Sequence, residues 1–149
     1  MFRFEHNLLH LLHIYLLRMD QLINCKTYSI DEALIKLQKY CSYQERCHQE
    51  VQQKLRGMHM IPEAIDVVIA HLLEHNFLNE ERFAVQFAGG HFRIKGWGRV
   101  KIQHALQQKR VSKYNIKIGL KAIEEDAYLK TLEQLAAKKW NSLKGERGL

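Results

Sequence analysis

The sequence predicts an all-α protein in which tandem three-helix repeats form an elongated, curved helical body. Apolar residues recur at helical spacing almost throughout, extended runs of alternating β-branched residues are absent, and the single proline is Pro62. The sequence also matches itself at a fixed offset, which is the signature of a repeat protein. Its 149 residues, 46% apolar and 26% charged, can bury a core and fit one ordinary domain or a few small units in a row.

The offset between the repeats is 51 residues. At this offset apolar residues fall on apolar residues along two helices: Val51 on Ile102, Leu55 on Leu106, Ile65 on Ile116, Ile69 on Leu120 and Leu72 on Ile123. Ala33 likewise falls on Ala84 in a further helix, so each repeat contains three helices. A three-helix unit has little core of its own, and we therefore expect neighbouring units to stack.

The repeat divides the chain into four segments. These are a loosely ordered leader over residues 1–28, a first repeat over 29–78, a basic second repeat over 79–126, and the first helix of an incomplete third repeat over 127–149. The leader holds an apolar run of about ten residues, which is too short to cross a bilayer and has no signal-peptide cleavage site after it. Residues 1–18 are either a loosely held leader or sequence upstream of a start at Met19.

Each helix of the first repeat has a recognisable boundary. The first begins after Ser29, whose hydroxyl can form a capping box with Glu32. The second ends near Gly57, and the third begins at Pro62, a favoured first-turn residue, and ends around His75. The apolar faces of the three helices are formed by Leu34, Leu37 and Cys41, by Val51, Leu55 and Met58, and by Ile65, Val68, Ile69 and Leu72.

The second repeat carries most of the positive charge. The chain has 23 Lys and Arg against 16 Asp and Glu, and no acidic residue occurs between Arg82 and Glu124. We call the ten basic residues of this interval the cationic cluster: Arg82, Arg93, Lys95, Arg99, Lys101, Lys109, Arg110, Lys113, Lys117 and Lys121. Like charges repel one another, so an acidic protein surface or a polyanion is the simplest compensation.

Two basic ridges are predicted on consecutive helices of the second repeat. The ridge on the middle helix comprises Arg99, Gln103, Gln107 and Arg110. The ridge on the last helix comprises Lys113, Lys117 and Lys121, which are four residues apart and so share one face. The ridges are either ordinary solvated surface, as most Lys and Arg are, or a binding surface for an anionic partner.

The turn Lys95-Gly96-Trp97-Gly98-Arg99 joins the first two helices of this repeat. Backbone N–H groups at a helix N-terminus, amid cations, suit a phosphate or a carboxylate. Alternatively, the glycines allow a tight interhelical turn while Trp97 packs on Ile102. A dinucleotide-binding fingerprint is excluded, because no strand precedes the turn and Lys101 stands at the third glycine position.

The expected partner-binding or phosphate-binding residues come from the cationic cluster and the turn: Arg93, Lys95, Gly96, Trp97, Gly98, Arg99, Lys101, Lys109, Arg110, Lys113 and Lys117. We expect no catalytic residue, no metal site and no cofactor. His71, Glu74 and His75 match the H-x-x-E-H pattern of zinc peptidases, but so short a match arises easily by chance in a chain with nine His. Three cysteines without C-x-x-C spacing predict buried thiols and a reducing compartment rather than a disulfide framework.

Two stretches of the second repeat resemble the RecX family of bacterial regulatory proteins. They are Leu78-Asn79-Glu80-Glu81-Arg82-Phe83-Ala84 and Phe92-Arg93-Ile94-Lys95-Gly96-Trp97-Gly98-Arg99-Val100-Lys101-Ile102, followed by Leu106, Lys109, Val111 and Ser112. The resemblance covers about residues 29–145. It implies tandem three-helix repeats and a protein that binds the RecA recombinase filament on single-stranded DNA and inhibits its ATP hydrolysis and strand exchange. The sequence departs from the family at Asn79, where Asp is usual, at Arg110, where Gly commonly ends the middle helix, and in the missing part of a third repeat.

The leading hypothesis is therefore a monomeric, cytoplasmic, non-catalytic modulator of a RecA-type filament, with single-stranded DNA nearby and no membrane association. The alternative is a helical nucleic-acid-binding module that acts without recombinase and inserts its middle helix into a DNA groove. A third hypothesis, a zinc-dependent hydrolase, would use His71, Glu74 and His75.

Overall fold

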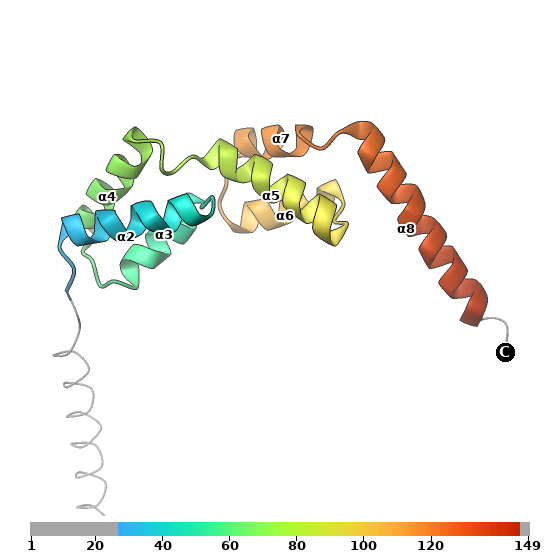
Figure 1. Cartoon of the computed structure of the whole chain (residues 1–149), viewed down its shortest axis with the longest axis horizontal. Helices are drawn as coiled ribbons and strands as arrows, with labels where there is room; N and C mark the ends of the chain where they lie inside the picture. The colour runs from blue at the N-terminus through green and yellow to red at the C-terminus, as the bar shows by residue number, and fades with distance from the viewer. Residues whose placement is uncertain (1–26, 147–149) are drawn as a thin grey trace, which may run out of the picture.

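The computed structural model describes residues 27–146, which form seven helices and no strand. The helices are α2 (Ile30–Tyr43), α3 (His48–Arg56), α4 (Pro62–Glu74), α5 (Glu80–Lys95), α6 (Arg99–Gln108), α7 (Lys113–Lys121) and α8 (Glu125–Glu146). They follow one another along an extended body, with α2–α4 at one end, α5–α7 in the middle and α8 at the other end (Figure 1). The predicted all-α class is confirmed, whereas most of the predicted leader lies outside the described residues.

Local sequence explains where several of these helices begin. At the start of α2, the backbone N–H of Glu32 donates to Ser29 Oγ at 3.2 Å, and Glu32 Oε2 accepts from the backbone N–H of Ser29 at 2.9 Å. This is the expected capping box. Pro62 is the first residue of α4, and the Asn79 side chain caps α5 by accepting from the backbone N–H of Arg82. Asn79 thus performs the capping role that an Asp would perform at this position.

A first core lies between α2, α3 and α4. Its fully buried side chains include Leu37, Val51, Leu55, Val68 and Leu72, which the helical periodicity assigns to the apolar faces. Leu34 and Ile69, also expected on those faces, are half-buried and pack against the edge of this core. We call α2–α4 the first unit.

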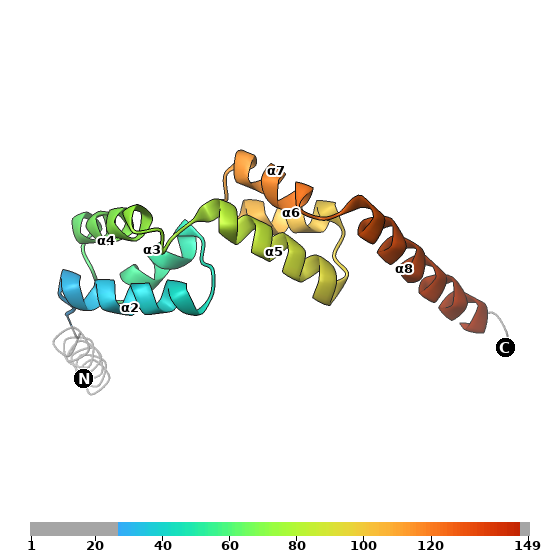
Figure 2. The ribbon, with the colours of Figure 1, turned by 45° about the horizontal axis from the view of Figure 1, so that its top comes forward.

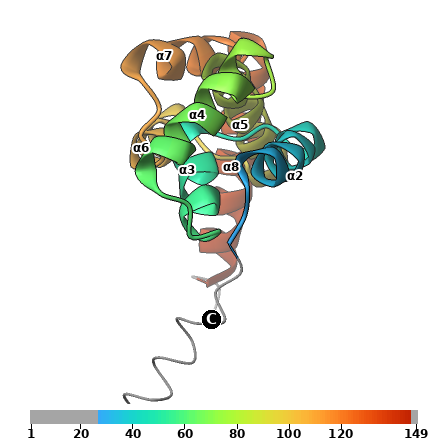
Figure 3. The same cartoon turned by 90° about the vertical axis from the view of Figure 1, so that its left-hand side faces the viewer.

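A second core lies between α5, α6 and α7, which we call the second unit. Ala84, Ile102, Leu106 and Ile116 are buried there, in agreement with the repeat, and so is Phe83, whose equivalent 51 residues earlier is Glu32. The two units follow each other along the long axis, and viewed from the α2–α4 end they fall within one compact outline (Figure 3).

The backbone repeats in detail at the offset of 51 residues. After α3, the backbone N–H of Met60 donates to the carbonyl of Leu55; after α6, that of Val111 donates to the carbonyl of Leu106. His59 and Arg110, which also differ by 51 positions, both adopt a left-handed backbone with φ of 57° and 58°. The expected stripe on the middle helix is therefore wrong at Arg110, because α6 ends at Gln108 and the left-handed turn carries Arg110 off the helix.

The helix α8 leaves the second unit at one end. Its residue Tyr128 packs on Phe92, with ring centroids 5.9 Å apart, and belongs to the edge of the second core. Further along α8, Leu129, Leu132 and Trp140 are about half exposed or more. The helix extends away from the body in two views (Figures 1 and 2). No helix within residues 27–146 is both long and apolar enough to span a membrane.

Candidate functional site

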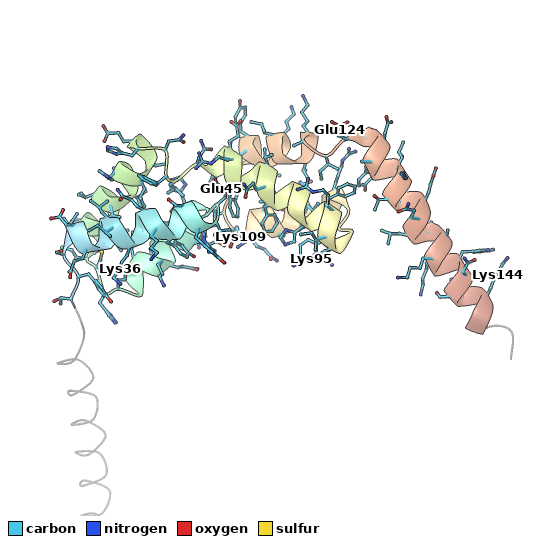
Figure 4. The ribbon with its side chains drawn as sticks, in the orientation of Figure 1. Lys36, Glu45, Lys95, Lys109, Glu124 and Lys144 are labelled. Carbon is cyan, nitrogen blue, oxygen red and sulfur yellow. The ribbon has the colours of Figure 1, made fainter. Side chains whose placement is uncertain are left out.

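Two members of the cationic cluster hold the joint between the two units. The Arg82 guanidinium forms an ion pair with Glu45, which lies between α2 and α3, and also donates to the backbone carbonyl of Asn76 at 3.1 Å. The ammonium of Lys109 lies 2.7 Å from a carboxylate oxygen of Glu50 on α3. Figure 4 shows Glu45 and Lys109 where the first unit meets α5. The charges of Arg82 and Lys109 are therefore compensated by acidic side chains of the first unit. The sequence analysis did not identify these two ion pairs.

A third member, Arg99, pairs with the start of α8. Its guanidinium lies 2.6 Å from Glu125, donates to the carbonyl of Ile123 at 3.1 Å, and stacks over the Tyr128 ring at 4.4 Å. The hydrogen bond that Arg99 donates to Glu125 raises the pKa of Arg99, so the guanidinium keeps its charge. Arg99 thus fixes where α8 leaves the second unit.

The other seven members have no carboxylate within ion-pair distance among residues 27–144: Arg93, Lys95, Lys101, Arg110, Lys113, Lys117 and Lys121. All seven are exposed. The expectation of uncompensated charge therefore applies to these seven residues and not to the whole cluster. Such a surface favours an external anionic partner.

Four of the cations meet in a groove between α6 and α7. The groove has a volume of about 610 Å³ and is lined by Arg99, Gln103, Lys113, Ile116, Lys117, Leu120, Lys121, Ile123, Glu124 and Glu125. Of the two ridges expected from the sequence, Arg99 and Gln103 of the middle helix line this groove together with the three α7 lysines, whereas Gln107 and Arg110 do not. The α7 lysines lie one helical turn apart, a spacing that suits a chain of anionic groups. Glu124 and Glu125 mark the end of the groove where α8 begins.

The turn between α5 and α6 has the geometry of a helix stop. Gly96 adopts a left-handed backbone with φ of 61°, and its N–H donates to the carbonyl of Phe92 at 3.0 Å. The N–H of Trp97 donates to the carbonyl of His91 at 3.2 Å, and Gly98 then caps α6. The bond from Gly96 to Phe92 is the 5→1 bond of an αL helix cap, which explains Gly96 without an anion because glycine tolerates this conformation.

The side chain of Trp97 packs against the second core and carries cations on its ring. The ammonium groups of Lys101 and Lys95 lie 4.5 Å and 5.1 Å from the ring centroid. The expected packing of Trp97 at the edge of the core containing Ile102 is confirmed. The two lysines form a second basic surface, separate from the α6–α7 groove, because neither residue lines that groove.

The expected site residues thus fall in several places. Arg99, Lys113 and Lys117 line the α6–α7 groove; Lys95, Gly96, Trp97, Gly98 and Lys101 form the turn; Lys109 lies at the joint; and Arg110 lies beyond α6. The guanidinium of Arg93 folds over Gly89 on α5, where an added Cβ would lie 2.8 Å from it. Their assignment as binding residues stays a prediction.

The histidines of the H-x-x-E-H pattern contact each other and α2. The rings of His71 and His75 stack at 3.9 Å, and His71 Nε2 lies 3.3 Å from the Gln38 amide nitrogen. Within the described residues, no three His, Cys, Asp or Glu side chains are arranged to hold a metal ion.

The two described cysteines are buried, as expected. Burial raises the pKa of Cys41 to about 11 and also raises the pKa of Cys47, so both thiols stay protonated near neutral pH. Cys47 belongs to the second core although it precedes α3, and it therefore joins the two units. Cys25 lies outside the described residues.

Comparison with known proteins places these features in a family context. A family model described as RecX, second three-helix domain, matches residues 79–120. A regulatory protein RecX of Clostridium perfringens is 32% identical over 125 residues, which cover 84% of this chain and 54% of that protein. One from Serratia proteamaculans is 35% identical over 79 residues, covering 53% of this chain and 46% of that protein. The chain spans about half the length of these curated relatives.

Solved structures show the same fold. The crystal structure of RecX from Lactobacillus salivarius superposes with a TM-score of 0.71 at 22% identity, covering 78% of this chain and 75% of that one. A second crystal structure, of a regulatory protein RecX, superposes with a TM-score of 0.68 at 18% identity, covering 78% of this chain and 59% of that one.

Proposed function

Because the chain belongs to the RecX family of regulatory proteins, we propose that it binds a RecA-type recombinase filament on single-stranded DNA and inhibits its ATPase and strand-exchange activities. The observation that carries this proposal is the α6–α7 groove, where Lys113, Lys117 and Lys121 have no carboxylate partner among the described side chains. A groove of this charge suits the acidic surface of a filament or the phosphates of the DNA within it.

The mechanism is steric and electrostatic, without a chemical step. An elongated monomer that docks along the filament can contact neighbouring recombinase protomers at once and restrain their relative movement (Figure 2). ATP turnover and strand exchange both need that movement. The α6–α7 groove offers cations for binding, and one of its two carboxylates, Glu125, is already bound to Arg99.

The test is DNA-dependent ATP hydrolysis by a RecA-type recombinase, measured while this protein is titrated. The double variant Lys113→Glu with Lys117→Glu reverses two groove charges on α7, and at Lys113, the first residue of the helix, an acidic side chain is compatible with the helix dipole. We expect it to need about ten times more protein for half-inhibition. The matched control, Lys36→Glu with Lys39→Glu, reverses two exposed charges on α2 and should inhibit like the parent protein. Absence of inhibition by the parent protein at stoichiometric amounts would refute the proposal.

The alternative function is nucleic-acid binding without recombinase. It is favoured by the outward face of α6, on which Gln103, His104 and Gln107 are exposed side chains able to reach base edges. Titration with duplex DNA alone separates the two functions. Tight binding that does not sharpen in the presence of recombinase would support this alternative, whereas weak binding that tightens on a filament would support the first.

A further inference from the structure

A second groove runs along α5, on a different surface from the α6–α7 groove. It has a volume of about 230 Å³ and is lined by Gln44, Glu45, Phe83, Gln86, Phe87, Gly90, His91, Ile94 and Lys95. Phe83, Phe87 and His91 are four residues apart and so share one face of α5, while Gln44 and Glu45 come from the chain between α2 and α3. Glu45 lies near the N-terminal half of α5 and Lys95 near its C-terminal end (Figure 4).

An aromatic ladder runs along α5 and continues to Trp97, and three of its rings, those of Phe83, Phe87 and His91, line the groove. The ring centroids of Phe83 and Phe87 lie 5.6 Å apart, those of Phe87 and His91 lie 3.9 Å apart, and those of His91 and Trp97 lie 4.5 Å apart. The planes of Phe87 and His91 lie 26° apart, so these two rings are stacked. Aromatic side chains offer an apolar surface to which a further aromatic group can pack, either offset-stacked or edge-to-face.

His91 is held in a single orientation within the ladder. Its Nδ1 lies 2.9 Å from the carbonyl oxygen of Phe87, and its Nε2 lies 3.5 Å from the Lys95 ammonium. Because a carbonyl oxygen only accepts and an ammonium only donates, the two contacts fit a ring with its proton on Nδ1. The His91 ring is therefore fixed in position against Phe87.

Gly90 leaves the middle of the groove open. A Cβ built on Gly90 meets no heavy atom within 4 Å, although the residue lies inside α5. The amide side chains of Gln44 and Gln86 line the groove and offer both donors and acceptors. Such groups can pair with the polar edge of a base.

Cations surround this aromatic surface. Lys109, which pairs with Glu50, lies 6.0 Å and 5.8 Å from the ring centroids of Phe83 and Phe87, while Lys95 and Lys101, which have no carboxylate partner among the described side chains, flank Trp97. Aromatic rings beside a basic surface are what proteins use to bind single-stranded nucleic acid, since every base has an apolar face and every linkage a charge. At the other end, the Glu45 carboxylate is paired with Arg82.

We propose that the α5 groove binds an unpaired nucleobase of single-stranded DNA, which packs against Phe87 and His91 while the adjoining phosphates lie beside Lys95 and Lys101. The proposal rests on the proposed function in taking single-stranded DNA as the ligand. It adds a subsite that would distinguish single-stranded DNA from duplex DNA. Paired bases are stacked within a duplex and cannot enter the groove.

The experiment compares two labelled strands that carry the same number of phosphates, a short oligothymidylate and its abasic equivalent, by fluorescence anisotropy without recombinase. The parent protein should bind the base-bearing strand about tenfold more tightly. Gly90→Leu fills the groove from a helical position with open space and should abolish this preference while leaving affinity for the abasic strand unchanged. Gly90→Ala, the matched control, adds one methyl group and should retain the preference.

Several outcomes would overturn the proposal. Equal affinity of the parent protein for the two strands would show that phosphates alone are bound. An unchanged base preference in Gly90→Leu would place any base contact outside the groove. If poly-glutamate displaced the labelled oligothymidylate more effectively than unlabelled oligothymidylate does, the occupant of the groove would be an acidic peptide. Because no recombinase is present, these results are independent of the ATPase test, and either proposal can fail while the other stands.

Discussion

The first and second units share a backbone but differ in surface and in how closely their helices approach. The hydrogen bonds from Met60 to Leu55 and from Val111 to Leu106 are the same bond repeated 51 residues later. The surfaces differ because the second unit carries the cationic cluster, whereas the first unit supplies Glu45 that compensates part of it. The comparison shows that the repeated apolar pattern specifies the fold, and that the residues that do not repeat carry the specific contacts.

The two units also differ where their first and third helices cross. Ala33 and Val68 are buried in the first unit; the equivalent positions 51 residues later are Ala84 and Gly119. A Cβ added to Gly119 would lie 2.6 Å from the carbonyl oxygen of Ala84, so α7 approaches the backbone of α5 closely. Only the second unit therefore needs a glycine at this crossing.

The largest expected effect comes from adding a methyl group where α7 crosses α5. Gly119→Ala should lower the free energy of unfolding by about 3 kcal/mol, because the Ala84 backbone must move to admit the methyl group. Urea unfolding followed by circular dichroism measures the change. Gly90→Ala is the matched control, since its Cβ enters open space within a helix, and it should stabilise the protein by about 0.5–1 kcal/mol. Equal effects of the two substitutions would show that the close crossing is absent.

Much of the fold was predictable, because it depends on local or periodic signals. Ser29 and Pro62 mark helix starts, and the 51-residue offset pairs Leu55 with Leu106, both of which are fully buried. Helical periodicity reports which face of a helix is apolar and does not depend on where other helices lie. The capping groups act within a few residues, so the sequence alone displays them.

The partners of the cations were not predictable in the same way. Arg82 and Glu45 are 37 positions apart in the sequence, and Lys109 and Glu50 are 59 apart. Which charges meet depends on how the second unit sits on the first, and the periodic pattern contains no such information. The α5 groove was missed for the same reason, since one wall comes from the first unit; only the spacing of Phe83, Phe87 and His91 could have indicated it.

The next effect concerns the joint between the units. Arg82→Ala should lower the free energy of unfolding by about 2 kcal/mol, because it leaves the largely buried Glu45 carboxylate without its partner and frees the Asn76 carbonyl. Urea unfolding again measures the change. Lys121→Ala removes an exposed cation that has no carboxylate partner among the described side chains, and its effect should stay within about 0.5 kcal/mol. If the two variants are equally stable, Arg82 does not hold the joint.

A smaller effect is expected at the left-handed residues that follow α3 and α6. His59→Gly and Arg110→Gly should each raise the free energy of unfolding by about 0.5–1 kcal/mol, because glycine adopts φ near 58° without steric cost. Arg110→Ala separates strain from charge: it removes the cation but keeps a Cβ, and it should give no gain. A gain in one unit only would mean that the two turns are less alike than their φ values indicate.

A further effect, seen only at alkaline pH, concerns the buried thiol of the first core. Cys41 lies in the first core, where burial raises the pKa of its thiol from 9.0 to about 11. In the unfolded chain the thiol loses its proton near pH 9, whereas the folded protein retains the proton to about pH 11. The folded state thus binds more protons across this interval, and the free energy of unfolding should fall as pH rises from 9 to 11. Cys41→Ala should show a shallower decline than the parent protein in urea unfolding at matched pH, because other groups still titrate but this one is gone. Identical slopes would mean that the Cys41 thiol is not shielded from water in the first core.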